Sequence, residues 1–229
     1  MIISHSHKYI FIKSTKTAGT SIEAALSSHC GGDDVVTPLG DYEFNRDKSG
    51  AWVHKSMNEG GHQQHDDALT IRNSLPAEVW DGYFKFSIAR NPWERTLSRF
   101  FWNHRNDPAL KPQKRFYHSL GIPFDELGPA RKAFTRFLRE EEWDTNDRFY
   151  IIDGELCVDY IIRYENLAQD LNEVCKRVGL PEMQLPHLKS GIRKRDHHYS
   201  EYYDAESRTL VADRHQNDIN LFGYRFETL

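Results

Sequence analysis

Two apolar runs, each followed by a polar turn and an amphipathic segment, set the pattern of this chain. Residues 9–12 and 83–89 are rich in aromatic and β-branched side chains, which predicts two buried strands. Apolar residues at helical spacing over 22–26 predict a helix after the first strand. After the second strand, Asn91 and Pro92 are a typical N-cap and first-turn pair. The sequence therefore predicts two strand–turn–helix units.

The remaining elements complete an α/β pattern. Interleaved helices and buried strands predict a central, mostly parallel sheet flanked by helices, in a single domain over residues 1–229. Three polar stretches without a period, 29–67, 104–130 and 181–200, are predicted to be loops. The other predicted elements are helices over 68–74, 130–142, 166–178 and 204–221, a hairpin at 150–158 turning at Asp153-Gly154, and a strand over 159–163.

The first polar turn, residues 13–21, has the chemistry of an anion-binding loop. Backbone N–H groups and the positive end of the helix dipole would face the anion. Gly19 lets the backbone approach closely, Lys16 adds a point charge, and three hydroxyl side chains add donors. The lysine precedes the glycine, which excludes the nucleotide triphosphatase pattern G-x-x-x-x-G-K-[ST]. An ordinary strand–turn–helix with a solvated lysine is the alternative.

The second strand–turn–helix segment places a guanidinium at the end of its strand, where the first segment has its polar turn. Arg90 directly follows the predicted strand, and Ser98 lies about two turns into the following helix. Ligands of open parallel sheets bind at the carboxyl ends of the strands, and a guanidinium suits phosphate.

Composition limits the classes of function. The 229 residues are 38% hydrophobic, enough for a core, and the net charge of −4 gives no general case for nucleic acid or an anionic membrane. No apolar stretch approaches the ~18 residues of a membrane span, and the start does not resemble a signal peptide. Three separated cysteines suggest a reducing compartment, so we expect a cytoplasmic protein, although a chain trimmed of a membrane anchor has the same features.

Twelve histidines raise the question of a metal site. His62 and His65 are three residues apart, but no cysteine or carboxylate completes a zinc pattern. We therefore expect no metal.

The two strand–turn–helix segments together resemble the donor-binding motifs of sulfotransferases. Phe-Ile-Lys-Ser-Thr-Lys-Thr-Ala-Gly-Thr-Ser at 11–21 is similar to their 5′-phosphosulfate loop, and Phe-Ser-Ile-Ala-Arg-Asn-Pro-Trp-Glu-Arg-Thr-Leu-Ser at 86–98 to their 3′-phosphate motif. Tyr-Glu-Asn-Leu at 164–167 and Leu-Phe-Gly-Tyr at 221–224 resemble the branch that modifies carbohydrates. The likeness spans most of the chain, from about 9 to 226, whereas residues 30–64 and 104–149 match nothing.

The resemblance implies a P-loop NTPase-like sulfotransferase fold and the donor 3′-phosphoadenosine 5′-phosphosulfate (PAPS), without a metal. The acceptor would be a hydroxyl of a carbohydrate or small molecule, and Lys16 would also act in catalysis. The implied donor-binding residues are Lys16, Thr17, Ala18, Gly19, Thr20 and Ser21 for the 5′-phosphosulfate, Arg90 and Ser98 for the 3′-phosphate, and Lys189 and Arg193 in a loop over the nucleotide.

The acceptor hydroxyl also needs a base, which related sequences place between the two motifs. A histidine or a carboxylate does this best near neutral pH. We prefer His65, because it precedes the segment leading into the second strand, with His62 next; a surface histidine in a loop is the alternative. The full candidate set is His54, Glu59, His62, His65, Asp66 and Asp67.

Two other functions remain open. A nucleotide-dependent phosphotransferase needs a Walker lysine and a magnesium carboxylate, which the sequence does not offer. A non-catalytic nucleotide- or glycan-binding module would keep Lys16 and Arg90. Aromatic and basic residues in 99–118 suit either sugar stacking or an ordinary core and surface.

Overall fold

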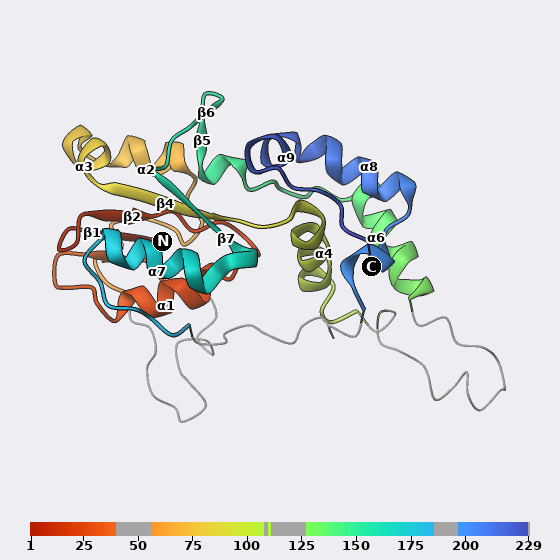
Figure 1. The fold of residues 1–229 in the computed structure, drawn as a ribbon, viewed down its shortest axis with the longest axis horizontal. Coiled ribbons are helices and arrows are strands. Elements are labelled where there is room, and N and C mark those ends of the chain that lie inside the picture. Colours follow the sequence, from red (N-terminus) through yellow and green to blue (C-terminus); the bar gives the residue numbers. More distant parts are fainter. Residues whose placement is uncertain (40–55, 108–109, 111–126, 186–196, 229) are drawn as a thin grey trace. The chain divides into compact units, whose positions relative to one another are not determined.

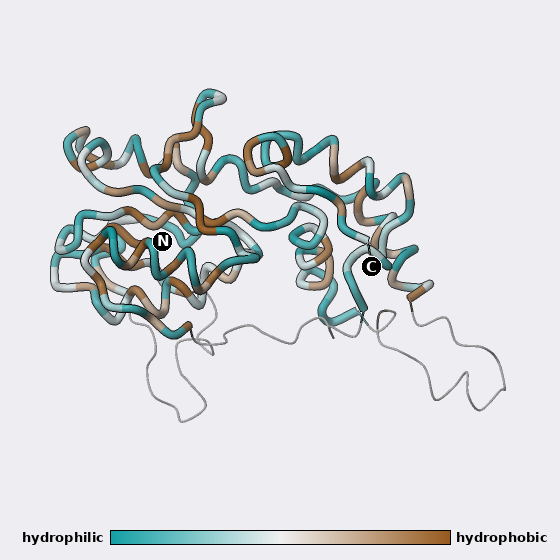
Figure 2. Tube along the Cα trace, viewed as in Figure 1, coloured by the Kyte–Doolittle hydropathy of each residue, from teal (hydrophilic) through white to brown (hydrophobic). Residues whose placement is uncertain are grey.

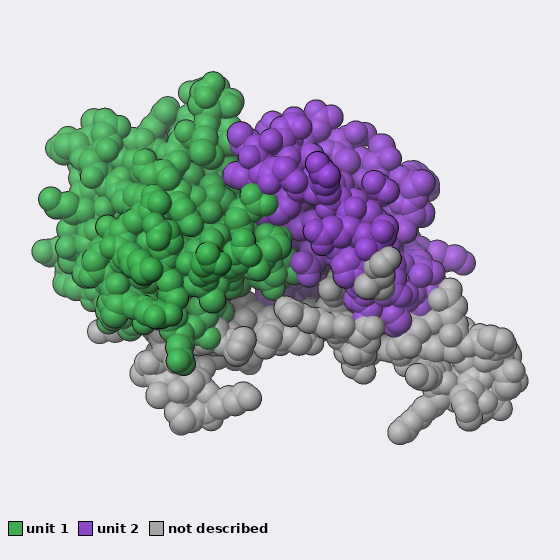
Figure 3. All heavy atoms as spheres, in the orientation of Figure 1, with its two compact units in different colours: residues 1–90, 146–190 green, residues 91–145, 191–229 purple. Residues whose placement is uncertain are grey.

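The structure, a computed structural model, describes residues 1–39, 56–107, 110, 127–185 and 197–228. The chain divides into two compact units, shown in Figure 3. Unit 1 comprises Met1–Arg90 and Asn146–Ser190, and unit 2 comprises Asn91–Thr145 and Gly191–Leu229. This division does not test the single domain expected over residues 1–229, which stays a prediction.

Unit 1 is built on a five-stranded sheet with the order β3-β1-β2-β4-β7 (Figure 1). The pairs β2–β4 and β4–β7 are parallel, and β1 is antiparallel to both β2 and β3. The α/β class with a central sheet flanked by helices is thus confirmed. The expectation of a mostly parallel sheet is wrong, because two of the four strand pairs described in this sheet, both made by β1, are antiparallel. Its strands are β1 (Ile2–Ser4), β2 (Tyr9–Phe11), β3 (Val35–Val36), β4 (Phe84–Ala89) and β7 (Tyr160–Arg163).

Helices cover both faces of this sheet. Alternate side chains of β2 and β4, among them Phe11 and Phe86, pack on helices α1 (Gly19–Ser27) and α7 (Leu167–Arg177). Figure 1 shows α2 (Ala68–Ser74) and α3 (Ala77–Gly82) over the other face, where Lys85 Nζ donates to Trp80 O at 3.1 Å. In Figure 2 these helices mix hydrophobic and hydrophilic positions, as half-buried helices do.

The turns in the later part of unit 1 form at the residues that the sequence predicts. The hairpin β5 (Ile151–Ile152) and β6 (Glu155–Leu156) turns at Asp153 and Gly154, whose φ angles are 53° and 85°. Two positive φ values suit the twist of a two-residue hairpin. Two 3₁₀ turns, η3 (Asp147–Phe149) and η4 (Tyr164–Asn166), precede β5 and α7, and α7 is followed by Gly179 at φ 70°.

Unit 2 is helical with an aromatic core. Asn91 Oδ1 accepts hydrogen bonds from Trp93 N and Glu94 N, which confirms it as the N-cap of α4. Phe100 is fully buried, with ring centroids 5.3 Å from Phe134 and 5.6 Å from Phe137, so it belongs to the core. The elements are α4 (Pro92–Asn103), α6 (Gly128–Glu140), η5 (Tyr199–Tyr202), α8 (Ala205–Arg214) and α9 (Gln216–Phe222).

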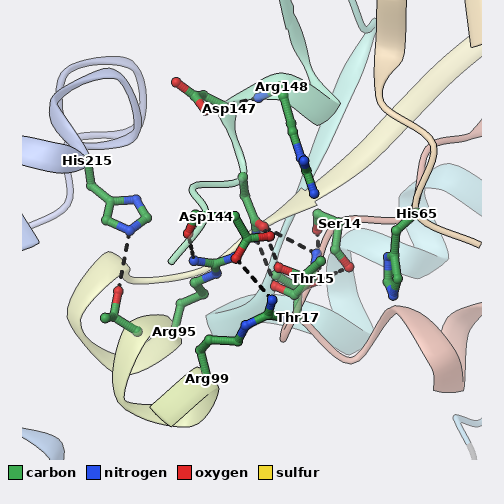
Figure 4. Close-up of polar contacts among 12 residues, drawn as sticks. Ser14, Thr15, Thr17, His65, Arg95, Arg99, Asp144, Asp147, Arg148 and His215 are labelled. Atoms are coloured by element: carbon green, nitrogen blue, oxygen red, sulfur yellow. Dashed lines mark hydrogen bonds and ion pairs between the residues drawn. The ribbon is translucent and has the colours of Figure 1, made fainter. Parts of the chain in front are cut away.

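The single helix predicted over 204–221 is wrong, because His215 breaks it. His215 has φ −106° and ψ 27° and lies between α8 and α9. Its side chain is 1% exposed, and Nδ1 lies 2.6 Å from Asp218 Oδ2. Its Nε2 lies 3.3 Å from Thr96 Oγ1, the contact drawn as a dashed line from His215 in Figure 4. These buried polar contacts fix the imidazole against α4, and local periodicity does not reveal them.

A buried carboxylate organises the turn between β1 and β2. Asp34 is 1% exposed; its Oδ1 accepts from His5 N at 2.6 Å and Ser6 N at 3.0 Å, and its Oδ2 from Gly31 N at 2.8 Å. Burial opposes ionisation, but the hydrogen bonds from Gly31 and Ser6 lower the pKa of Asp34 below its ordinary value. The turn therefore depends on an ionised Asp34.

Asp34→Ala should lower the free energy of unfolding by about 1–3 kcal/mol at pH 7, because it leaves buried backbone donors without their acceptor. A carboxylate with a lowered pKa adds stability above its unfolded pKa of 3.8 and loses it as the pH falls through the folded value. The difference in free energy of unfolding between the wild type and Asp34→Ala, measured by urea unfolding, should thus shrink below pH 3.8. The neighbouring exposed Asp33→Ala is the control, and equal losses for both variants would contradict this account.

Candidate functional site

Residues 13–18, here called the anion loop, connect β2 to α1 at the carboxyl edge of the parallel strands. Lys16 and Ala18 have left-handed φ angles of 62° and 64°. Ser14 Oγ donates to Ile88 O of β4 at 2.6 Å and lies 2.8 Å from Thr17 Oγ1. Both hydroxyl side chains are buried, so they hold the loop in shape, and an anion would meet the loop's backbone.

Gly19 begins α1 and allows a close approach within the protein itself. A Cβ built on Gly19 would lie 2.8 Å from Lys13 Cγ and 3.4 Å from Ser14 O. The missing side chain thus makes room for Lys13. The N-cap residue Ala18 offers no side-chain acceptor, and the first turn of α1 holds no acidic residue. The positive end of the helix dipole therefore faces the loop without a competing carboxylate, which fits an anionic group.

A second chain segment holds the middle of the loop. Asn146, which is 3% exposed, accepts from Thr15 N at 3.2 Å and Thr15 Oγ1 at 2.9 Å, and its Nδ2 donates to Thr15 O at 2.9 Å. No sequence pattern points to this contact, because 131 residues separate the partners and residues 104–149 match no motif.

Arg90 lies against the anion loop from the end of β4. Its NH1 donates to Lys16 O at 2.9 Å, and its Cζ lies 3.9 Å from the centre of the Tyr164 ring. Tyr164 begins η4, directly after β7. Two of the sequence motifs, which are far apart in the chain, thus meet at the edge predicted to bind a ligand.

The other predicted donor-binding residues are placed as follows. Thr20 and Ser21 lie in the first turn of α1, half-buried and buried respectively. Ser98 is half-buried on α4 of unit 2, and Arg90 belongs to unit 1, so their joint 3′-phosphate site stays a prediction. Lys189 and Arg193 lie outside the described residues, as does His54.

Among the candidate bases, His65 contacts the anion loop. Its Nδ1 lies 2.9 Å from Lys13 O, and because a carbonyl oxygen only accepts, Nδ1 must donate. Figure 4 shows His65 on the same side of the view as Ser14 of the loop. In the neutral imidazole, Nε2 then carries the lone pair that a base needs. His62 instead lies 3.3 Å from Asp66 Oδ2, and Asp67 caps α2 by accepting from Thr70 N.

Lys13 joins the loop to the segment that carries His65. Its Nζ lies 2.5 Å from Glu23 Oε2 of α1 and 3.3 Å from Gln64 Oε1, and Lys13 and Glu23 are 1% and 0% exposed. The neighbours Gln64 and His65 therefore contact the ammonium and the carbonyl of one lysine. The sequence places Lys13 at a strand end but does not reveal its burial.

The environment keeps His65 neutral. Burial, and then the positive charge of Lys13, lower the pKa of His65 from 6.5 to about 4, although the hydrogen bond to the Lys13 carbonyl acts in the opposite direction. The ring of Phe149 adds apolar surroundings, with centroids 6.3 Å apart. The imidazole is therefore an unprotonated acceptor at neutral pH.

Two further findings concern the described residues. No group of three or more His, Cys, Asp or Glu side chains among them could hold a metal ion. No helix within the described part of the chain is both long and apolar enough to cross a membrane.

Comparison with known proteins identifies the class to which this fold and site belong. The model of the sulfotransferase family matches residues 1–225, so the chain belongs to that family, and the resemblance found in the sequence is confirmed.

Curated relatives include carbohydrate sulfotransferase 10 of Homo sapiens, 26% identical over 171 residues that cover 62% of this chain and 47% of that protein. The protein of the same name from Gallus gallus is 27% identical over 171 residues, again 62% of this chain and 47% of that protein. An uncharacterized protein of Archaeoglobus fulgidus is 30% identical over 115 residues, 50% of this chain and 83% of that protein. This chain thus spans about half the length of the curated sulfotransferases it matches, and no solved structure matches it significantly.

The site makes one prediction about protonation. In an NMR titration the ring of His65 should titrate with a midpoint near pH 4, because burial and Lys13 penalise the imidazolium. Between pH 4 and 6.5 the unfolded chain then binds a proton that the folded chain does not, so stability falls as the pH is lowered through this window. Lys13→Met should move the midpoint upward. A wild-type midpoint at 6.5 would contradict the neutral site.

Proposed function

We propose that the protein transfers a sulfuryl group from PAPS to a hydroxyl of an acceptor, with a carbohydrate as the first acceptor class to test. The observation that carries the proposal is the contact of Arg90 with the Lys16 carbonyl. It brings together, at one sheet edge, two segments that resemble the donor-binding motifs of sulfotransferases. Strand β2 is parallel to β4 and leads through the anion loop into α1, and this arrangement supports a P-loop-like version of the α/β fold.

The donor would be held mainly by charge and backbone donors. In this proposal the N–H groups from Lys16 to Ser21 and the positive end of α1 bind the 5′-phosphosulfate. Arg90 and Ser98 bind the 3′-phosphate, and Lys189 and Arg193 close over the nucleotide. The guanidinium of Arg90, already stacked on Tyr164, loses little freedom when it binds a phosphate.

In the transfer step, protein groups position the reactants and stabilise charge. The sulfuryl group passes in line between two oxygens, so the chemistry resembles phosphoryl transfer. Lys16 stabilises the charge that grows on the leaving phosphate, an interaction strongest in the transition state. His65 accepts the proton of the acceptor hydroxyl at Nε2, while Nδ1 remains bonded to Lys13 O. Because sulfate carries less charge than a terminal phosphate, lysine and amides suffice, and we expect no metal.

Donor binding should be independent of metal. With EDTA present, 3′,5′-bisphosphoadenosine should raise the Tm by several degrees, because a ligand of the folded state shifts unfolding by mass action. Arg90→Ala should weaken this affinity by about 10- to 100-fold, since a charge-assisted contact is lost.

Arg177→Ala is the matched control, because Arg177 also stacks on a tyrosine, Tyr160, at 4.9 Å but lies on α7. Stabilisation by ATP with magnesium alone would instead favour a phosphotransferase. Nucleotide binding without sulfate transfer to any acceptor in a screen with labelled PAPS would favour a binding module.

His65 should carry the proton transfer. His65→Ala should lower kcat by about 10²- to 10⁴-fold with nucleotide affinity kept, the range for losing a general base. With the pKa of His65 near 4 in the free protein, the wild-type kcat/KM should fall only near pH 4, and this acid limb should vanish in the variant. His62→Ala should keep the wild-type rate, since His62 pairs with Asp66. An inactive His62→Ala beside an active His65→Ala would assign the base to His62.

A further inference from the structure

The side chain of Asn146 does not do what an asparagine at its position ordinarily does. It is the N-cap residue of η3, where an asparagine side chain ordinarily accepts from the following backbone N–H groups. Here the side chain makes no such capping bond. Its amide is directed at Thr15, with which it forms three hydrogen bonds of 2.9–3.2 Å in a buried environment. The contact with the loop therefore replaces the local role of the residue.

The chemistry of this contact suits an amide in particular. Thr15 presents a backbone N–H and a hydroxyl, which need an acceptor, and a backbone carbonyl, which needs a donor. A carboxamide supplies both kinds of group, whereas a carboxylate only accepts and a hydroxyl is too short to span both. Asn146 therefore fixes the plane of the peptide groups on both sides of Thr15.

The residue that follows Thr15 depends on this support. Lys16 has a φ of 62°, a left-handed conformation that is unfavourable for a residue with a Cβ and is stabilised here by neighbouring contacts. Ser14 holds the loop on one side through Ile88 O, and Arg90 holds the Lys16 carbonyl on the other. Asn146 controls the peptide between these anchors.

We propose that Asn146 is a positioning residue, which holds the anion loop in its ligand-binding conformation before the donor arrives. This inference rests on the proposed function, because the benefit of a preformed loop appears as donor affinity. The same segment also places the Phe149 ring against His65, so the stretch Asn146–Phe149 supports both the loop and the candidate base.

The first experiment compares Asn146→Ala with Asn172→Ala. Asn172 is a half-buried asparagine of the same unit, and its side chain bonds Glu182 at 2.6 Å, at the surface. At a temperature well below both Tm values, Asn146→Ala should weaken the Kd for 3′,5′-bisphosphoadenosine by about tenfold or more, and Asn172→Ala should not. The Thr15 amide should also exchange its hydrogen faster in Asn146→Ala. Wild-type affinity together with wild-type exchange in folded Asn146→Ala would overturn the proposal.

A second pair of variants keeps the proposal testable if Asn146→Ala does not fold. Thr15→Val removes the hydroxyl that donates to Asn146 and should weaken nucleotide binding by about two- to tenfold, whereas Thr15→Ser keeps it and should bind as wild type. Equal nucleotide affinities for Thr15→Val and the wild type would contradict the positioning role of Asn146. In a foldable double variant, Thr15→Val should add nothing to Asn146→Ala, because both act through one contact.

The readouts separate this inference from the proposed function. If the wild-type protein does not bind 3′,5′-bisphosphoadenosine, the donor assignment fails, and Thr15 amide exchange still tests the positioning role. Faster exchange in Asn146→Ala would then support the positioning role without the donor. If the wild type binds the nucleotide and Asn146→Ala binds it equally well with unchanged exchange, the donor assignment stands and Asn146 has no positioning role.

Discussion

The anion loop depends on backbone conformations that its own residues disfavour. Lys16 and Ala18 both lie in the left-handed region, at a cost of order 1 kcal/mol each. Contacts from outside the loop impose them: the end of β4 provides the Ile88 carbonyl and the Arg90 guanidinium, and Asn146 provides its amide. The shape of the proposed donor site is therefore a property of the sheet edge as much as of the loop sequence.

A single buried residue connects this loop to the candidate base. The Lys13 carbonyl orients the His65 imidazole, and the Lys13 ammonium pairs with Glu23 of α1. A buried ion pair adds little net stability compared with apolar packing, but losing one partner leaves an uncompensated charge. Its main consequence here is geometric, because α1 and the segment around His65 both contact Lys13, the first residue of the loop. The fold of unit 1 thus fixes how the anion loop lies relative to the candidate base His65.

The sequence predicted the features that local patterns encode. Apolar runs and turn residues gave β2, β4, β7, the Asp153-Gly154 hairpin and the Asn91 cap, since each depends on neighbours in the chain. Strands β1 and β3 escaped notice because three and two residues are too few to show a period. The break at His215, the burial of Lys13 and the contact of Asn146 with Thr15 depend on partners distant in sequence. The roles of the site residues, His65 above all, stay predictions.

Gly19, the first residue of α1, has a consequence for how the sequences of this family are expected to vary. Position 19 lacks a side chain because the Lys13 stem occupies the space that a Cβ would need. The two positions therefore share one volume, and substitution at either changes what the other tolerates. Among relatives that conserve this packing, an alanine at the equivalent of Gly19 should occur together with a shorter residue at the equivalent of Lys13. A glycine that would ordinarily be explained by close approach of a ligand is here also required by packing inside the protein, and covariation between these two positions is the expected evolutionary record.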